Sequence, residues 1–141
     1  MATPLRGLVE SAFATYLTGA ITSTPCNIYA GMATGTKEPP CVICKAESGE
    51  EDPVQSGNYR VEVSVTAKGM AADGVEAFDT LCDAVREALS VDGLHDTLAA
   101  QVTGLAVWGI ASEFKMEWDT DEDALTERTV FEVYCAAASL T

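Results

Sequence analysis

Cys41 and Cys44 have a spacing that can carry chemistry. Cysteines separated by two residues form redox centres and, with further cysteine or histidine ligands, bind zinc. Here Pro39 and Pro40 precede a hydrophobic run, which predicts the entrance of a strand rather than the start of a helix. Residues three apart on a strand point to opposite faces, so the two sulfurs would diverge. Because the chain contains no second CxxC, we expect ordinary buried thiols and no bound metal or other cofactor.

The segment from Asp119 to Asp123 has the alternating carboxylates that begin a calcium-binding loop. An EF-hand would then need glycine at Ala124, glutamate at Val130 and a helix on either side. Neither residue fits, and the flanking segments alternate as strands do. We therefore interpret the segment as the acidic tip of a hairpin, with at most weak cation binding.

The single histidine, His95, lies beside Asp96 without a nucleophile at a defined spacing. It is expected at the surface or at the start of a helix. The sequence contains no phosphate-binding loop, dinucleotide fingerprint, nucleophile elbow or zincin motif. These observations predict that the protein is not an enzyme.

The composition predicts one domain spanning residues 1–141 and argues against some classes of partner. The chain is 48 % hydrophobic, enough for a core, and has a net charge of −14. Such a charge repels phosphate backbones and anionic lipids, which argues against specific nucleic-acid binding and membrane docking. No signal peptide is expected, and the longest apolar stretch, Leu98 to Ala111, is too short to span a membrane. The five cysteines are therefore expected to be reduced, in a cytoplasm.

Two main helices are expected. Thr3 would cap the first helix, Pro4 fits its first position, and Gly19 fits the position just past its end. Asp73 to Glu76 reads as a capping box that opens the second helix, and a short helical stretch follows at Leu94 to Gln101. The helical spacing predicts one buried stripe of Leu5, Leu8, Val9, Ala12, Phe13, Tyr16 and Leu17, and another of Val75, Phe78, Leu81, Cys82, Val85 and Leu89.

Strands are expected on both sides of the second helix, with a hairpin at the C-terminal end. Residues 47–58 read as a mobile acidic loop, and residues 119–127 as the acidic tip of the hairpin. The predicted fold class is α+β: a single mixed, mainly antiparallel β-sheet flanked by two main helices, with a C-terminal β-hairpin. The first three expected strands are Cys26–Ala30, Cys41–Ala46 and Tyr59–Lys68, and the third has Tyr59, Val61, Val63, Val65 and Ala67 on one face. The fourth strand has Trp108, Ile110, Phe114, Met116 and Trp118 on one face. The fifth strand, Arg128–Ala137, has Thr129, Phe131, Val133 and Cys135 on one face.

This order of elements resembles the tail-terminator (tail-completion) proteins of long-tailed bacteriophages, and the resemblance covers most of the chain. It begins with the amphipathic first helix and a short strand through Ile28 to Gly31. A proline-entered hydrophobic strand follows at Pro39 to Ile43, and then a long loop that leads into the alternating strand. The second helix and a closing strand pair that ends in Glu127 to Val133 complete the similarity.

The resemblance implies a structural virion protein of the tail or neck, made in the cytoplasm of the bacterial host. Family members form a six-membered ring that caps the head-proximal end of the tail tube, ends tube polymerisation and joins the tail to the head connector. The implied partners are further copies of the chain (a hexamer), the tail tube protein and the connector protein, while DNA passes without specific binding. The family has no catalytic residues, and its long loop, here residues 47–58, faces an assembly neighbour.

Acidic side chains would suit a wall around passing DNA, because carboxylates repel phosphate at short range. We therefore expect some carboxylates of the two acidic segments to line the lumen of the ring or an interface between subunits. The alternative for each is a solvated side chain that aids solubility. The candidates are Glu50, Glu51, Asp52, Asp119, Asp121, Glu122 and Asp123.

Other functions stay open. The chain could be another phage neck or minor tail protein, since these share similar layouts. It could be a cytoplasmic adaptor with metal or redox chemistry at Cys41 and Cys44. It could also be a monomeric adaptor that pairs through an exposed sheet edge.

Overall fold

A computed structural model of the chain describes residues 5–22, 26–31, 40–51, 58–70, 72, 74–120 and 124–137, and for residues 51, 112–120, 124 and 137 it describes the backbone alone. Helices and strands follow one another in the predicted order. They are α1 (Leu5–Ala20), β1 (Asn27–Ala30), β2 (Cys41–Glu51), β3 (Tyr59–Met70), α2 (Val75–Leu89), α3 (Leu94–Ala99), β4 (Leu105–Thr120) and β5 (Ala124–Ala137).

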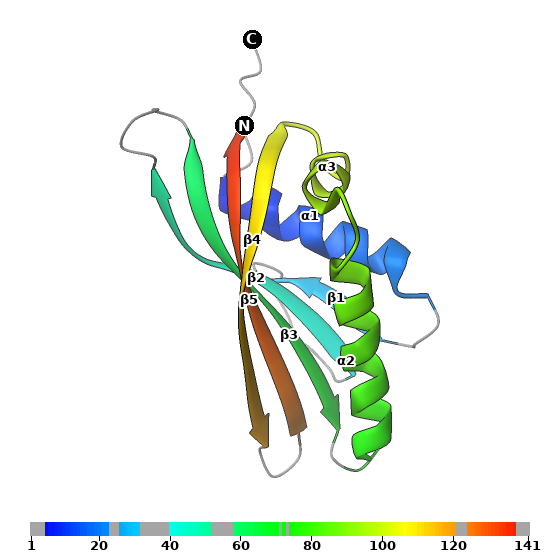
Figure 1. Cartoon of the computed structure of the whole chain (residues 1–141). Coiled ribbons are helices and arrows are strands. Elements are labelled where there is room, and N and C mark those ends of the chain that lie inside the picture. Colours follow the sequence, from blue (N-terminus) through cyan, green and yellow to red (C-terminus); the bar gives the residue numbers. More distant parts are fainter. Residues whose placement is uncertain are drawn as a thin grey trace.

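The strands form one mixed sheet in the order β1-β2-β3-β5-β4 (Figure 1). The pair β1–β2 is parallel, and the other neighbouring pairs are antiparallel. β4 and β5 are the expected C-terminal hairpin. The predicted α+β fold class is therefore confirmed. The strand order, which the sequence does not reveal, makes β1 one edge of the sheet and β4 the other.

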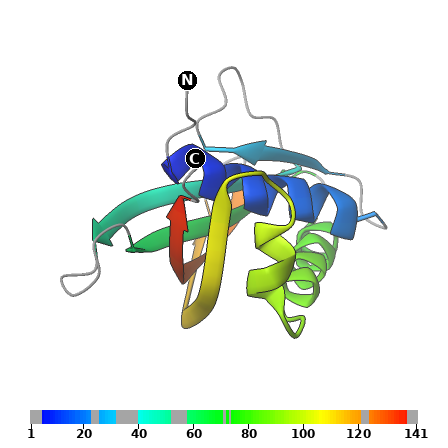
Figure 2. The same ribbon diagram turned by 90° about the horizontal axis from the view of Figure 1, so that it is seen from above.

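The helices cover one face of the curved sheet (Figure 2). α1 packs on β1 and β2, α2 packs on β3, and α3 packs on β4. Phe13 of α1 is fully buried, and its ring centre lies 6.2 Å from that of Phe131 in β5. The Tyr16 hydroxyl donates a hydrogen bond of 2.5 Å to the Ala88 carbonyl, which joins α1 to α2. Complete burial of a large apolar side chain such as that of Phe13 contributes roughly 1.5–3 kcal/mol to the free energy of folding.

The first helix has the predicted stripe but a different end. Val9, Ala12, Phe13 and Leu17 are buried, and Leu5, Leu8 and Tyr16 are partly buried against the core. Gly19 lies inside the helix, which continues to Ala20, so its predicted position past the helix end is wrong. The helix meets solvent there, and nothing forces it to stop at the glycine. Thr3 and Pro4 lie outside the described residues.

The second helix begins without the predicted capping box. Its N-cap is Gly74, with φ of 92° and no side-chain cap hydrogen bond, and Asp73 lies outside the described residues. Val75 is 61 % exposed, so its place in the predicted core stripe is wrong. As the first helical residue, it lies at the exposed beginning of α2, where Glu76 and Ala77 are exposed as well. The rest of the predicted stripe is buried: Phe78, Leu81, Cys82, Val85 and Leu89.

β3 confirms the alternation read from the sequence, because Val61, Val63, Val65 and Ala67 are all buried. β2, in contrast, continues to Glu51, so the prediction that residues 47–51 belong to a loop is wrong. The pairing of β2 with β3 shifts by one residue between Ala46 and Ser48. This β-bulge breaks the alternation, which is why the sequence gives no strand signal there.

β4 also contains irregular pairing, between Val107 and Gly109 and between Ser112 and Met116. Trp108 lies in the first irregularity and is 50 % exposed, so its predicted place on the core face is wrong. The side chains of Phe114, Met116 and Trp118 lie outside the described residues. β5 begins at Ala124, and the acidic connection is therefore shorter than the predicted 119–127. Glu127 belongs to the strand and is buried.

Candidate functional site

The acidic candidates that the structure describes, Glu50, Glu51 and Asp119, lie at two opposite ends of the sheet. Glu50 and Glu51 end β2, where they pair with Arg60 and Tyr59 of β3. Asp119 lies near the end of β4, opposite Thr126, at the level of the far end of β3. In Figure 1, β2 ends at the upper left and β4 ends at the bottom. At about 3.3 Å per residue, the length of β3 separates the two ends by roughly 30 Å.

The structure therefore does not bring Glu50 and Glu51 together with Asp119. The side chains of Glu51 and Asp119 are not described, and Asp52, Asp121, Glu122 and Asp123 lie outside the described residues. Of the seven, Glu50 alone has a described side chain. Its carboxylate is exposed and forms a 2.5 Å ion pair with the Arg60 guanidinium.

That pair belongs to a group of paired charges on the face of the sheet opposite the helices. Arg60 also lies 3.8 Å from the Glu132 carboxylate of β5. Glu47 of β2 accepts a 2.7 Å hydrogen bond from the Ser64 hydroxyl and lies 3.5 Å from the Arg128 guanidinium. These contacts tie β2, β3 and β5 together, and they neutralise part of the acidic surface that the sequence predicts.

The environment of Glu47 favours its ionised form. The hydrogen bond from Ser64 lowers the pKa of Glu47, and the positive charges of Lys45 and Arg128 lower it further against the opposing effect of partial burial. Hydrogen bonding to Glu50 and the charge of Glu132 raise the pKa of Arg60, which therefore stays protonated. The face thus carries fixed, mutually compensating charges.

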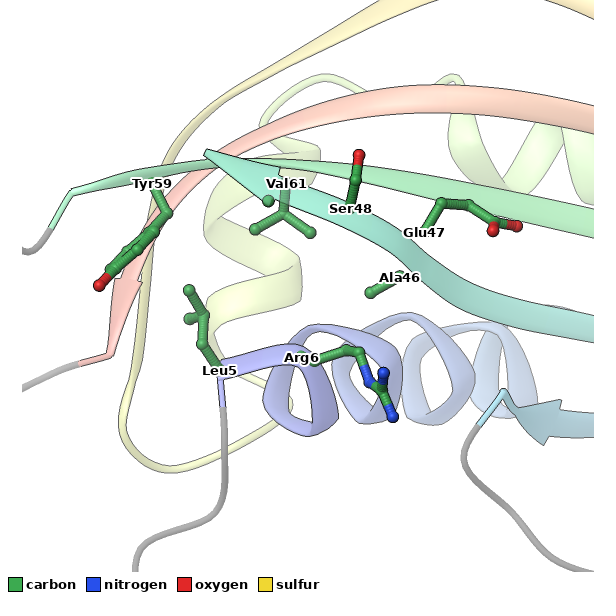
Figure 3. Close-up of a pocket in the computed structure, with 8 residues that line it drawn as sticks. Leu5, Arg6, Ala46, Glu47, Ser48, Tyr59 and Val61 are labelled. Carbon is green, nitrogen blue, oxygen red and sulfur yellow. The ribbon is translucent and has the colours of Figure 1, made fainter. Parts of the chain in front are cut away.

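A cleft of about 300 Å³ lies between the start of α1 and the β2–β3 hairpin (Figure 3). Leu5, Tyr59 and Val61 provide apolar surface, and Arg6 of α1 lies at its side. Glu47 borders the cleft, but its carboxylate contacts Ser64 on the other face of the sheet. The described lining can hold an apolar side chain, and it does not place an acid and a base within reach of one another.

Cys41 and Cys44 are fully buried in β2, as predicted. Cys41 is aligned with Lys68 of β3, and Cys44 is aligned with Val65 in the core, so the two cysteines occupy opposite faces. Burial and the negative charge of Glu10 raise the pKa of Cys44 to about 12. Because a thiolate is the reactive and metal-binding form, this thiol is poorly suited to either role at neutral pH.

Two buried carboxylates were missed in the sequence. Glu10 of α1 is 1 % exposed and accepts a 2.8 Å hydrogen bond from the Ala46 N–H, beside the bulge in β2. Gly31 leaves room for this carboxylate, because a Cβ there would lie 3.0 Å from Glu10 Oε2 and 2.8 Å from the Lys45 side chain. Glu10 precedes Phe13 by three positions, a helical spacing that places it beside the apolar stripe.

Glu127 of β5 is the second buried carboxylate, with 4 % of its surface exposed. It forms an ion pair with Arg86 of α2, and Arg86 in turn lies 2.7 Å from Asp83. Burial and a hydrogen bond to Glu127 raise the pKa of Cys82 beside it. The burial of Glu127 could have been predicted from the sequence, because Glu127 continues the alternation of Thr129, Phe131 and Val133 on the face that the helices cover.

The remaining sequence candidates have simple positions. His95 is the second residue of α3, where a helix-start histidine was predicted, and its Nε2 lies 3.6 Å from Asp96 Oδ1. The Asp119–Asp123 segment is flanked by strands β4 and β5, as predicted, and not by the helices of an EF-hand. Within the described part of the chain, no three His, Cys, Asp or Glu side chains gather as a metal site would require.

No protein-family model matches the chain, and no curated protein matches it. None of the helices in the described residues has the length and apolar character needed to cross a membrane.

Proposed function

We propose that the chain is a structural virion protein, a tail terminator that forms a ring at the head-proximal end of a phage tail tube. The observation that supports this most is the arrangement of the elements. A mixed sheet is covered on one face by helices, and its elements follow the order on which the resemblance rests. A mixed sheet flanked by helices is what the resemblance implies for the family.

The use of the polar groups in the subunit also supports a structural role. The buried carboxylates Glu10 and Glu127 hold a helix to the sheet. The charged side chains of the open face pair across three strands. In the described residues, every buried polar side-chain atom has a hydrogen-bond partner. These groups therefore contribute to a rigid building block.

The separation of the two acidic ends refines the lumen hypothesis. In a ring whose axis follows the strands, one end would face the tail tube and the other the head connector. We propose that the Asp119–Asp123 end lies along the path of the DNA, because Glu50 at the other end is already paired with Arg60. Reversal of Asp119, Asp121, Glu122 and Asp123 to lysine should make the ring retain DNA or misassemble. Unchanged assembly and DNA passage in the reversed protein would remove the lumen assignment.

The function is tested by adding the chain to the polymerising tail tube protein of the same phage. A terminator should stop tube growth at a small molar ratio to the tube protein, and the capped tubes should then bind purified heads. Tubes of unchanged length that still bind the chain would indicate a different neck or minor tail protein. No binding to tubes or to heads would contradict the proposal. Loss of activity in Cys44→Ser, together with bound zinc, would favour the adaptor with chemistry at Cys41 and Cys44.

A further inference from the structure

The two longest uncharged segments of the sequence contain the two edge strands of the sheet. No residue is charged between Glu10 and Lys37, and β1 lies in this interval. Residues 97–112 are also uncharged, and they include the first half of β4. The three strands between these edges carry the paired charges of the open face. In a chain with a net charge of −14, the edges are therefore where like-charged copies can meet with the least repulsion.

The edge formed by the first half of β4 has the features of an interaction surface. β4 pairs with β5 on one side, and no described strand pairs with its other side. Trp108 is half exposed there, and the neighbouring Ala106 is exposed as well. Natural proteins usually protect an open edge with charged side chains, and residues 105–111 have none. A large exposed aromatic residue is typical of the centre of a protein interface.

The directions of the strands fit a contact between β4 and β1. β1 runs parallel to β2, and each following neighbour in the sheet reverses direction, so β1 and β4 are antiparallel. If successive copies are rotated about an axis along the strands, β4 of one copy meets β1 of the next in antiparallel orientation. A contact between two different surfaces repeats until a ring closes, whereas a β4–β4 contact gives a two-fold dimer.

We propose that the uncharged half of β4 in one copy pairs with β1 of the next copy, so that the sheet continues from subunit to subunit around the ring. This inference rests on the proposed function and names the surfaces that build the ring. Main-chain hydrogen bonds would provide affinity, and Trp108 would be covered by the neighbouring copy.

Two charge-introducing variants test the two edges separately. Ala106→Glu places a carboxylate on β4, and Asn27→Glu places one on β1. Both positions are exposed, so the subunit should keep its fold and its free energy of unfolding. Ala77→Glu, at an exposed position of α2, is the matched control because it adds the same charge away from both edges. Native mass spectrometry should find each edge variant monomeric at concentrations where the control and the wild type form the closed oligomer.

An equimolar mixture of the two variants tests whether the two edges meet each other. The Ala106→Glu copy keeps an intact β1, and the Asn27→Glu copy keeps an intact β4. The mixture should therefore form a heterodimer and nothing larger. A mixture that stays monomeric would overturn the β4–β1 contact, as would an Asn27→Glu variant that still assembles alone. Normal rings from both variants would overturn this inference and leave the proposed function standing, whereas a monomeric wild type at every concentration would overturn both.

Discussion

Two regions of the molecule differ in the kind of residue that they contain: the contacts between the helices and the sheet, and the outer edge of β4. Glu10 and Glu127 are almost completely buried charged residues, and each is held by a specific partner inside the subunit. Trp108 is a large apolar residue that is half exposed at the sheet edge. The first arrangement stabilises one copy, and the second leaves the apolar surface that we propose another copy covers. Substitutions in the two regions should therefore separate stability from association.

The largest loss of stability is expected for Glu10→Ala. The change leaves the buried Ala46 N–H without its acceptor and opens a cavity between α1 and β2. We expect the free energy of unfolding to fall by about 2–4 kcal/mol, measured by urea denaturation. Glu10→Gln keeps an oxygen acceptor and should cost about half as much. A Glu10→Ala protein as stable as the wild type would show that the contact does not hold α1 to the sheet.

Arg86→Ala should have the next largest effect. It removes the cation that pairs with Glu127, whose side chain is 4 % exposed. The Arg86 side chain is itself 42 % exposed, so solvent weakens the pair. We expect a loss of about 1–3 kcal/mol in the free energy of unfolding. Arg60→Ala is the matched control on the open face. Its pair with Glu50 is solvent-exposed, so we expect a smaller loss of stability than for Arg86→Ala. Equal losses in both variants would contradict the distinction between the two faces.

The sequence predicted the elements whose pattern is regular. The alternation of β3 and the helical stripes of α1 and α2 follow from burial on one face, and the structure has them. The second half of β2 was not predicted, because the bulge near Ala46 breaks its alternation. Trp108 was wrongly predicted on the core face, because the pairing of β4 is irregular at this residue. Gly109 beside Trp108 was a usable hint, since glycine inside a strand often marks a bulge.

The site was harder to predict because it depends on contacts distant in sequence. Glu10 and Ala46 come from different elements, and only the packed fold brings the carboxylate to the Ala46 N–H beside the bulge. Likewise, the strand order that separates the two acidic ends cannot be read from a single alternating pattern. The clustering of charge was visible in the sequence, but the partner of Glu50 was not.

A smaller effect is expected from the pH dependence of the contact between Glu47 and Ser64. The pKa of Glu47 is lowered in the folded protein, mainly by this hydrogen bond, so the contact stabilises the fold above the ordinary glutamate pKa of 4.5. That contribution disappears as the pH falls through the lower folded value. Ser64→Ala should cost about 1 kcal/mol or less at pH 7, and its difference from the wild type should shrink in acid. A difference that stays constant with pH would contradict this role.

The smallest effect on stability is expected for Trp108→Ser. Because half of the side chain already meets solvent, we expect the free energy of unfolding of the monomer to change by only about 0.5 kcal/mol. Association should nevertheless be lost, which is the reverse of the pattern expected for Arg86→Ala. Urea denaturation at low protein concentration, compared with the oligomer mass at high concentration, measures both quantities. A large loss of monomer stability would show that Trp108 stabilises the fold of the single copy, and it would contradict a role in association alone.

Native mass spectrometry tests most directly whether this chain closes into a ring of identical copies, as we propose. The measurement should cover a wide concentration series without added chelator, so that it reports subunit number and bound metal together. We predict one discrete closed oligomer, a hexamer, with no metal. A wild-type protein that stays monomeric at every concentration, or a monomer carrying one zinc ion, would contradict it.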